Sequence, residues 1–341
     1  MSGVQHVSVG EDEAEQRLDR WFRRQFPHIA QGRIEKLCRK GEIRVDGARV
    51  KTATRIAPGQ VVRVPPLPVA EALPAPQPKA PSEAEAKALQ NAVLWRDEHL
   101  IVLDKPAGLA VQGGSGQHRH LVAQLASLRF GREDDPRLVH RLDKDTSGVL
   151  VLARTGAAAV ALSRLFRTRA VEKIYFALVA GRPSPQAGTI RYGLVKAGGA
   201  GSEKMRIVHP DELASTVHAR SATTDYRVIE QAGDRVAWVA LRPVTGRTHQ
   251  LRAHMAALGT PIVGDGKYGG RSAENKGDGW GSSLGGAVSR KLHLHAARLA
   301  FPHPMTGQRL SFDAPLPEHM RRSFDLLGWQ EAAVEAPLFP A

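Results

Sequence analysis

Long apolar segments, thiols and aromatic side chains are all scarce in this chain of 341 residues. No apolar run approaches the roughly 20 residues that a membrane-spanning helix requires, so we expect no membrane partner. The lone cysteine, Cys38, excludes an internal disulfide and a thiol-based zinc site, which favours a reducing compartment. The N-terminal stretch MSGVQHVSVGEDEAEQ is polar and acidic, unlike a secretory signal or an anchor, and we therefore expect a cytoplasmic protein.

Acidic residues are outnumbered by basic ones. Lys and Arg total 48 against 34 Asp and Glu, a formal net charge of +14. An excess of this size favours a polyanionic partner, such as nucleic acid or an anionic membrane surface. A merely soluble basic protein is the alternative. With hydrophobic residues at 42% and aromatics at only 5%, the core is expected to consist mostly of Ala, Val, Leu and Ile.

Large apolar side chains are sparse in residues 66–92, which are rich in proline and alanine instead. Repeated proline prevents regular secondary structure at the start of this stretch. We therefore interpret residues 66–92 as a semi-rigid, extended linker. It divides the chain into a small N-terminal domain, residues 14–65, and a larger C-terminal domain, residues 93–330.

The N-terminal domain is predicted to combine two helices with short strands. Apolar residues from Leu18 to Phe26 recur at helical spacing, and a second helix in GRIEKLCRKG is expected to stop at Gly41. The stretch IRVDGARV predicts two strands around an Asp-Gly turn, and APGQVVRVP a further turn and strand. Between residues 16 and 65, 13 Lys and Arg stand against 4 Asp and Glu. Much of the positive excess therefore lies in the smaller domain.

The C-terminal domain alternates strand-like and helix-like segments without an internal repeat. Strands are predicted for VLVLAR, KIYFALVAG, TTDYRVIEQ, RVAWVALRPVTG and KLHLHAARLAFPHP, and a helix ending at Gly259 for THQLRAHMAALG. Residues 156–167 predict another helix, with Val160 and Phe166 as core contacts. Residues 269–287 are rich in Gly and Ser and are expected to form a mobile polar loop.

One carboxylate stands among cations in HRLDKDTSG, residues 140–148, just before the apolar segment VLVLAR. The leucine between Arg141 and Asp143 breaks the kinase H-R-D spacing, and neither a glycine-rich phosphate loop nor D-F-G accompanies it. Asp, Thr, Ser and Gly are turn formers, so a structural turn explains the stretch as well as a catalytic aspartate does. This motif alone leaves both interpretations open.

Two further segments carry residues that fit either a structural or a chemical role. Tyr175 lies on a predicted strand, where a core tyrosine with a satisfied hydroxyl is the usual case. In TGRTHQLRAH, Arg247 starts a helix and Arg252 lies inside it among Leu and Met. An arginine among core-facing neighbours needs a carboxylate partner, and Asp143 is the candidate; exposed helix charge is the alternative.

No metal site is predicted. His293 and His295 share one strand face and His249 and His254 share one helix, but a spacing of five residues is wrong for a two-histidine helical site. The sequence GSSLG at 281–285 matches the nucleophile motif G-x-S-x-G. It lies in a glycine-rich loop with neither the preceding strand nor the following helix that this motif requires, so we interpret it as chance.

Taken together, VHRLDKDTSGVLVLARTG, EKIYFALVAG, VTGRTHQLRAHM and DKPAGLAVQGG resemble a pseudouridine synthase of the RluA/RluC/RluD family. The segments PIVGDGKYGG and LHAARLAFPHPMTG fit the same family downstream. The N-terminal domain resembles the small RNA-binding domain named after ribosomal protein S-four, most visibly in LCRKGEIRVDGARVK. That combination is most similar to the RluC-type enzymes of large-subunit ribosomal RNA. Residues 183–216 match nothing that we can assign, and target-specific contacts are one role for them.

The resemblance implies isomerisation of uridine to pseudouridine, in which the base is detached from the ribose, turned and rejoined through carbon. No atoms are gained or lost, so no cofactor and no metal are expected. By resemblance, Asp143 is the catalytic aspartate, attacking either the base or the sugar. Arg252 is the cation that keeps it ionised, with Arg247 as the second choice. Tyr175 matches the active-site tyrosine that stacks on the base and moves a proton.

The substrate uridine must leave the RNA stack to reach such a site, at a cost of roughly a few kcal/mol. Arg141 matches the family residue that fills the gap, and His140 is expected to help there. Lys105, in DKPAGLAVQGG, and Arg247 complete the expected substrate contacts. In the small domain, the expected RNA-binding residues are Arg33, Lys36, Arg39, Lys40 and Arg44.

The resemblance implies an α+β catalytic domain with a central mixed, largely antiparallel sheet, preceded by a small α/β domain. The expected partner of the chain, a monomer, is large-subunit ribosomal RNA or a pre-ribosomal particle, with 23S ribosomal RNA as the expected target. A non-catalytic RNA-binding assembly factor is the alternative, weakened by the joint presence of Asp143, Tyr175 and Arg252. A hydrolase using GSSLG lacks both context and a triad.

Overall fold

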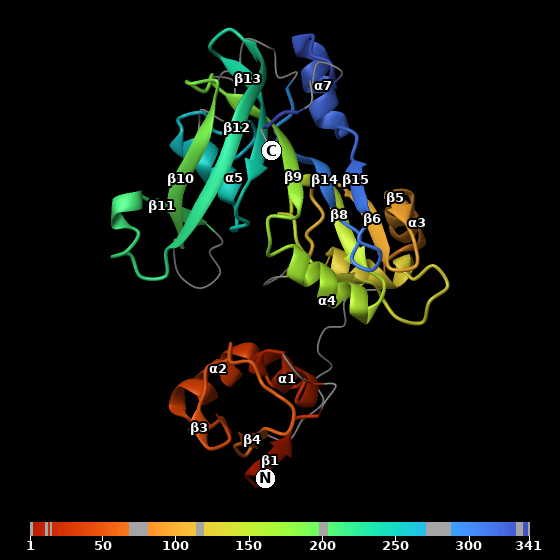
Figure 1. The fold of residues 1–341 in the computed structure, drawn as a ribbon, viewed down its shortest axis with the longest axis vertical. Helices are drawn as coiled ribbons and strands as arrows, with labels where there is room; N and C mark the ends of the chain where they lie inside the picture. Colours follow the sequence, from red (N-terminus) through yellow and green to blue (C-terminus); the bar gives the residue numbers. More distant parts are fainter. Residues whose placement is uncertain are drawn as a thin grey trace. The chain divides into compact units, whose positions relative to one another are not determined.

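The chain divides into two structural units, Met1–Gln77 and Pro78–Ala341, both drawn in Figure 1. The predicted small and large domains fall one in each unit. The computed structural model describes residues 3–10, 13, 16–67, 81–113, 119–197, 204–270, 288–331 and 337–339.

The first unit combines two helices with a four-stranded antiparallel sheet in the order β1-β4-β2-β3. Its elements are β1 (Gln5–Ser8), α1 (Leu18–Gln25), α2 (Gln31–Lys40), β2 (Arg44–Val45), β3 (Ala48–Arg49) and β4 (Val61–Val64). The predicted Asp-Gly turn joins β2 to β3, with φ of 47° at Asp46 and 78° at Gly47. Positive φ at both central residues is the conformation that a tight two-residue hairpin requires.

Helix α2 shows how this unit separates its core from its charge. Ile34, Leu37 and Cys38 are buried on one face, where they join Trp21 and Phe22 of α1. Burial raises the pKa of the Cys38 thiol to about 11, so the thiol stays protonated and packs as a small apolar group. Gly41 then ends the helix in the left-handed conformation, with φ of 72°, as predicted.

The second unit is organised around an eleven-stranded sheet. Nine strands follow the order β11-β10-β12-β13-β9-β14-β8-β6-β5, while β15 pairs with β14 and β7 with β8. Among the described strands, every pairing is antiparallel except that of β14 with β8. The predicted mixed, largely antiparallel sheet is therefore confirmed. The strands are β5 (Val93–Arg96), β6 (Leu100–Lys105), β7 (Arg137–Leu138), β8 (Ser147–Ala153), β9 (Glu172–Ala180), β10 (Ala187–Lys196), β11 (Met205–Val208), β12 (Arg220–Ala232), β13 (Val236–Pro243), β14 (Leu294–Pro302) and β15 (Arg309–Asp313).

Helices cover both faces of this sheet, which explains why its central strands are apolar without alternation. The helical segments are α3 (Glu83–Asn91), η2 (Leu121–Leu128), α4 (Gly156–Leu165), η3 (Pro210–Glu212), α5 (Gln250–Ala257) and α7 (Glu318–Leu327). On β9, Phe176 and Leu178 join the cluster that contains α7. The intervening Ala177 and Val179 join the cluster that contains α5. Figure 1 shows β9 running beside β14 and β8 in the middle of this arrangement.

The single parallel pairing explains the glycine of the DTSG motif. Residues 147 and 148 at the start of β8 lie opposite residues 295 and 296 of β14. Gly148 has φ of 107°, and a Cβ at this position would lie 2.2 Å from the Ala296 carbonyl oxygen. Only glycine fits this backbone approach. The close packing fixes where β8 begins, and the loop that carries Asp143 leads directly into it.

Part of the predicted linker belongs to the second unit. Residues 83–91 form α3, whose N-cap Ser82 makes a reciprocal capping box with Glu85. Leu89 of this helix is buried against Ile101 and Leu103 of β6. The prediction of an extended linker over 66–92 was therefore wrong for its C-terminal third, because the proline run masked a capped amphipathic helix that follows it.

Two smaller expectations also need correction or restriction. Val160 was expected in the core but is 55% exposed, because Ala158 and Leu162 form the buried face of α4 instead. Phe166 is half-buried and packs against the same cluster, as expected. The predicted mobile loop lies mostly outside the described residues, and so does GSSLG.

Candidate active site

A pocket of about 460 Å³ brings together all three predicted catalytic residues. Its walls come from the loop 139–146, the end of α4, strand β9 and the segment that leads from β13 into α5. Asp143, Tyr175 and Arg252 all line it. Three segments that lie far apart in the sequence therefore converge on one site of a size suited to a small ligand.

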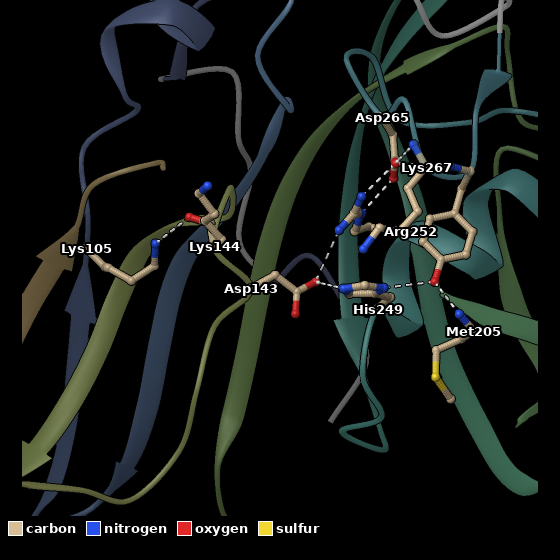
Figure 2. Close-up of polar contacts among 9 residues, drawn as sticks. Lys105, Asp143, Lys144, Met205, His249, Arg252, Asp265 and Lys267 are labelled. Atoms are coloured by element: carbon tan, nitrogen blue, oxygen red, sulfur yellow. Dashed lines mark hydrogen bonds and ion pairs between the residues drawn. The ribbon is translucent and has the colours of Figure 1, made fainter. Parts of the chain in front are cut away.

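Asp143 faces two nitrogen groups across the pocket. Its Oδ2 atom lies 3.7 Å from Arg252 Nη1 and 3.7 Å from His249 Nε2, as Figure 2 shows. The Asp143 side chain is 18% exposed, so one side of the carboxylate remains open to a ligand. Both contacts are longer than hydrogen bonds, a common state of catalytic contacts before substrate binds.

Arg252 has a closer partner than the one that was predicted. Its Nε and Nη2 atoms each donate to an oxygen of Asp265 at 2.7 Å, leaving Nη1 directed at Asp143. The prediction of Asp143 as the partner was thus incomplete: Asp265 holds the guanidinium by two hydrogen bonds and Asp143 lies on its other side. Burial opposes the charge, but hydrogen bonding to Asp265 and the two carboxylate charges raise the pKa of Arg252 above its usual value.

Asp265 is itself held from the other side. Its Oδ1 atom accepts hydrogen bonds from the backbone amides of Lys267 and Tyr268, at 3.0 and 3.2 Å. The Asp265 side chain is fully buried and that of Arg252 nearly so. A bidentate ion pair with this backbone support fixes the direction of the guanidinium, which gives Asp143 a cation in a constant position.

Tyr175 lies half-buried on β9, as predicted, and lines the same pocket. Burial, followed by the negative charge of Asp143, raises the pKa of its hydroxyl far above the usual value. The hydroxyl therefore keeps its proton at neutral pH. It can donate a hydrogen bond or a proton, but it cannot act as a general base before the reaction begins.

His140 lines the pocket, but its ring is already engaged by the protein. Its Nε2 atom accepts a hydrogen bond from the Val151 amide at 2.9 Å, and the ring stacks on Phe166 with centroids 4.2 Å apart. Burial, followed by the charge of Lys173, lowers the pKa of His140 to about 3. It is therefore a neutral part of the pocket wall, unlike its neighbour Arg141, which is exposed.

Arg247 also lines the pocket, with its side chain exposed and its Nε atom donating to the Ser221 carbonyl at 3.2 Å. It precedes α5 by three residues, whereas the sequence put it at the start of that helix. Arg141 and Arg247 are thus two exposed cations at the rim of the pocket. That position suits contacts with phosphates around a bound nucleotide.

Lys105 is held by hydrogen bonds to the protein itself. It is fully buried, and its ammonium donates to the carbonyls of Pro106, Leu109 and Lys144 at 2.8, 2.9 and 3.1 Å. The bond to Lys144, drawn in Figure 2, braces the loop next to Asp143. Burial lowers the pKa of Lys105 to about 8, although the charges of Asp145, Asp143 and Asp104 oppose this shift. These bonds give Lys105 a bracing role in the loop, and its predicted contact with substrate stays a prediction.

A second cavity, of about 1560 Å³, is lined by Lys105 and Lys144 together with residues of α3 and α7. It is larger than the pocket described above. Asp143, Tyr175 and Arg252 line only the smaller one. We assign the chemistry to the smaller pocket because the reacting groups must meet there.

The five predicted RNA-binding cations of the first unit are all exposed: Arg33, Lys36, Arg39, Lys40 and Arg44. Four lie on α2 and the fifth opens β2. Lys40 forms an exposed ion pair with Glu42 at 3.6 Å, and Arg44 donates to the carbonyls of Gly41 and Gly47. These exposed positive charges lie within one small unit, an arrangement that suits contacts with a phosphate backbone.

Among the described residues, no group of three or more His, Cys, Asp or Glu could hold a metal ion. His295 instead contacts Ser147 Oγ and the Ala314 carbonyl, and His293 contacts Ser323 Oγ and the Lys291 carbonyl. In the same part of the chain, no helix has the length and apolar character needed to cross a membrane.

Three site residues escaped the sequence interpretation: His249, Asp265 and Tyr268. His249 stood inside TGRTHQLRAH and was considered only as a metal ligand. Asp265 and Tyr268 stood inside PIVGDGKYGG, which was noted without a role for either residue. The available signal was a carboxylate and a phenol within one glycine-rich stretch. Nothing in the neighbouring sequence indicates that these two side chains turn toward Arg252.

Comparison with known proteins agrees with this geometry. Residues 99–257 match the model of a family described as RNA pseudouridylate synthase, a span that includes Asp143, Tyr175 and Arg252. The chain belongs to the RNA pseudouridine synthase family. That family consists of isomerases that act on RNA, so the predicted enzyme class is confirmed.

The relatives cover nearly the whole chain. The ribosomal large subunit pseudouridine synthase C of Vibrio cholerae is 35% identical over 320 residues, 94% of this chain and 96% of the relative. Its Escherichia coli counterpart is 36% identical over 325 residues, 95% of this chain and 97% of the relative. The resemblance to RluC-type enzymes is therefore confirmed, and it includes the first unit as well as the second.

A solved structure supports the fold independently. The human RNA pseudouridylate synthase domain containing 4 superposes with a TM-score of 0.58 at 32% identity, covering 71% of this chain and 95% of the human one. The human domain containing 1 gives a TM-score of 0.52 at 30% identity, covering 66% of this chain and 82% of the human one. The large sheet of the second unit is thus a pseudouridine synthase fold.

Proposed function

We propose that this protein converts uridine to pseudouridine at particular positions of large-subunit ribosomal RNA, specifically 23S ribosomal RNA, with Asp143 as the nucleophile. The observation that carries the proposal is the convergence of one partly open carboxylate, a fixed guanidinium and a protonated phenol in a pocket of about 460 Å³. The names of the relatives, which are synthases of the ribosomal large subunit, support the choice of RNA.

The chemistry needs what these residues supply. The bond from ribose to N1 breaks, a bond from ribose to C5 forms, and one proton leaves C5 while N1 gains one. Asp143 would attack the base or the sugar as a carboxylate, and Arg252 keeps that carboxylate charged in a partly dry site. Tyr175, whose hydroxyl keeps its proton, would lie against the base and donate to it. The reaction requires no external electrons or atoms.

A uridine within folded RNA reaches the pocket only if it is flipped out of its stack. Arg141 and Arg247, exposed at the rim, would contact the phosphates on either side or fill the gap that the base leaves. The cations of the first unit would hold the rest of the RNA through its backbone. We expect the enzyme to act on ribosomal RNA or a pre-ribosomal particle as a monomer in the cytoplasm.

The test uses RNA labelled with tritium at C5 of uridine, because pseudouridine formation releases that atom to water. Purified protein is incubated with a large-subunit ribosomal RNA transcript and, separately, with a small-subunit transcript. Tritium release from the large-subunit RNA alone, with stoichiometry matching mapped pseudouridines, supports the proposal. Tight binding without release would refute it and favour the non-catalytic assembly factor, whereas release from the small-subunit RNA would refute only the choice of substrate.

A further inference from the structure

A chain of polar contacts runs from the Met205 amide through Tyr268 and His249 toward Asp143. The Met205 amide donates to the Tyr268 hydroxyl oxygen at 2.8 Å, and that oxygen lies 2.9 Å from His249 Nδ1. The other ring nitrogen, Nε2, faces Asp143 Oδ2 at 3.7 Å. Figure 2 shows Met205, His249 and Asp143 aligned along this path. None of these contacts is needed to hold Arg252, which has Asp265.

The directions of the hydrogen bonds follow from the donors and acceptors available. Burial raises the pKa of Tyr268, so its hydroxyl is protonated and has one hydrogen to donate. Its oxygen already accepts from Met205, and among the described residues His249 Nδ1 is the acceptor within reach of that hydrogen. Tyr268 therefore donates to Nδ1, and the histidine proton lies on Nε2, which faces the carboxylate.

The backbone holds His249 in a conformation that side-chain-bearing residues rarely adopt. Its φ of 52° and ψ of 23° lie in the left-handed region, at the N-cap of α5. The next residue, Gln250, is buried and donates to the Thr223 carbonyl and Thr224 Oγ1. Gln250 also accepts from Thr245 Oγ1 and the Arg247 amide. The strained residue is thus clamped by its neighbours, a pattern found where strain serves a site.

The position of Met205 gives the unassigned segment 183–216 a role. Met205 is the first residue of β11, the edge strand of the sheet. Through its amide, this segment takes part in ordering the site, although none of its described residues lines the pocket of about 460 Å³.

We infer that His249, oriented by Tyr268 and the Met205 amide, is a positioning residue for Asp143 that stabilises its carboxylate with an Nε2 proton. The inference rests on the proposed function, since it assumes that Asp143 is the nucleophile. His249 and Arg252 then hold the same oxygen from two directions, so the other oxygen is the one available to attack. The 3.7 Å separation of His249 Nε2 from Asp143 Oδ2 is expected to shorten when RNA closes over the pocket.

Tyr268→Phe is the sharpest test, because it removes one hydrogen from the chain of contacts and almost no volume. Without that donor, the imidazole can move its proton to Nδ1 and turn a lone pair toward Asp143. We expect kcat to fall about tenfold, as for the loss of one hydrogen bond to a charged group. KM for RNA should stay unchanged, and the acidic limb of the pH–rate profile should move to higher pH.

The pH profile must be interpreted against every charged group near Asp143. Arg252 and His249 face it from α5, and Tyr175 faces it from β9. Lys105 acts on the loop from β6, Arg141 precedes Asp143 on the loop itself, and Lys144 and Asp145 follow it. Arg247 lines the same pocket. The phenylalanine keeps the aromatic ring that lies 5.3 Å from the Arg252 guanidinium and the backbone amide that donates to Asp265, so the change removes only the hydroxyl that reaches His249. A shift in the profile therefore reports on the histidine.

Tyr192→Phe is the matched control. It also replaces a tyrosine by phenylalanine, on β10, the strand that pairs with β11. In the described part of the chain the Tyr192 hydroxyl makes no hydrogen bond. It should leave kcat, KM and the pH profile as in the unmodified enzyme.

A second pair of variants keeps the test decisive if Tyr268→Phe unfolds. His249→Gln retains an N–H donor near the position of Nε2, whereas His249→Leu retains only the bulk. We expect His249→Gln to be about tenfold more active than His249→Leu at equal RNA affinity. Equal activity of His249→Gln and His249→Leu would overturn the inference. A pH–rate profile of folded Tyr268→Phe that equals that of the unmodified enzyme would overturn it too. Absence of tritium release by the unmodified enzyme would instead refute the proposed function.

Discussion

The two units of this protein use positive charge in opposite ways. The five predicted RNA-binding cations of α2 and β2 are exposed. In the second unit, Arg252 is only 7% exposed and Lys105 is fully buried, and each has fixed acceptors: Asp265 for the first and three carbonyls for the second. Exposed charges act additively through screened attraction, so each can be exchanged at little cost. A buried charge depends on partners at fixed positions. Removing one partner leaves the charge uncompensated, which destabilises the fold and displaces the groups around it.

The largest effect is expected at Asp143, the proposed nucleophile. Asp143→Asn should lower the single-turnover rate by a factor on the order of 10⁴ or more, the size seen when a catalytic nucleophile is removed. RNA affinity should be unchanged, since binding is spread over many exposed cations. Rates and filter-binding affinities measured on the same preparation check both halves. Asp145→Asn, an exposed carboxylate two residues away, is the control and should keep its activity; turnover by Asp143→Asn would refute the assignment.

The next largest effect is expected at the pair that holds the buried guanidinium. Asp265→Asn leaves Arg252 buried with a neutral partner, which should cost about 3 kcal/mol of the free energy of unfolding. The substitution should also let the Arg252 guanidinium shift relative to Asp143. A shift of about 1 Å should lower turnover about 100-fold. Thermal unfolding and single-turnover rates measure the two effects.

Asp313→Asn provides the matched control for that pair. Asp313 accepts from Arg298 Nε at 2.6 Å, but both side chains are well exposed. Removing this carboxylate should cost less than about 1 kcal/mol and leave turnover intact. Equal costs for the two substitutions would mean that burial does not distinguish the two kinds of charge.

Removing the first unit should weaken binding while sparing the chemistry. Residues 81–341 retain α3 and its buried Leu89, so a chain starting at Pro81 should fold where one starting at Asn91 would lack a core helix. We expect RNA affinity to fall about tenfold or more near physiological salt. The slope of log affinity against log salt should become shallower by about 0.7–0.9 for each phosphate that the shortened protein no longer neutralises.

A full-length variant carrying Arg33→Gln, Lys36→Gln and Arg39→Gln loses three positive charges but keeps the first unit. It therefore shows how much of the RNA affinity comes from these charges. It should reproduce part of the decrease in salt slope at an unchanged single-turnover rate under saturating RNA. Identical salt slopes for all three proteins would show that α2 does not meet RNA.

The last effect concerns acid, and it contrasts a buried histidine of the second unit with the exposed histidines of the first. Burial lowers the pKa of His254 to about 4, whereas an unfolded histidine titrates near about 6.5. Between these values the unfolded chain binds a proton that the folded one does not. His254 should therefore reduce stability as pH falls from about 6.5 toward 4, by up to about 1.4 kcal/mol per pH unit.

Hydrogen exchange followed by mass spectrometry at neutral and at mildly acidic pH measures this effect in each unit of the same molecule. The first unit should change less, since its described histidines, His6 and His28, are exposed. His254→Leu is the decisive variant, because neither ring nitrogen of His254 has a hydrogen-bond partner among the described residues. It should reduce the acid sensitivity of the second unit; no change would show that His254 titrates normally in the fold.

Local structure was predictable from sequence wherever a few neighbouring residues determine it. The stop of α2 at Gly41 and the hairpin at Asp46 and Gly47 follow from backbone conformations that those residues favour. The strand character of VLVLAR follows from its apolar side chains. The candidate catalytic residues came from the family resemblance, which rests on short motifs within single segments. The helix at 83–91 escaped because its own signal, the capping box from Ser82 to Glu85, was outweighed by the prolines before it.

By itself, the sequence determined the two-part organisation, the placement of charge on α2 and the presence of Asp143, Tyr175 and Arg252 in loop, strand and helix contexts that suit them. Only the tertiary structure decided what those residues contact. Asp265 pairs with Arg252 because the turn after α5 folds back on the helix, and Lys105 faces three carbonyls because β6 ends beneath the Asp143 loop. The parallel pairing of residues 147 and 295 joins segments that are 148 positions apart. Such contacts depend on how whole elements pack, and no stretch of sequence near either partner encodes them.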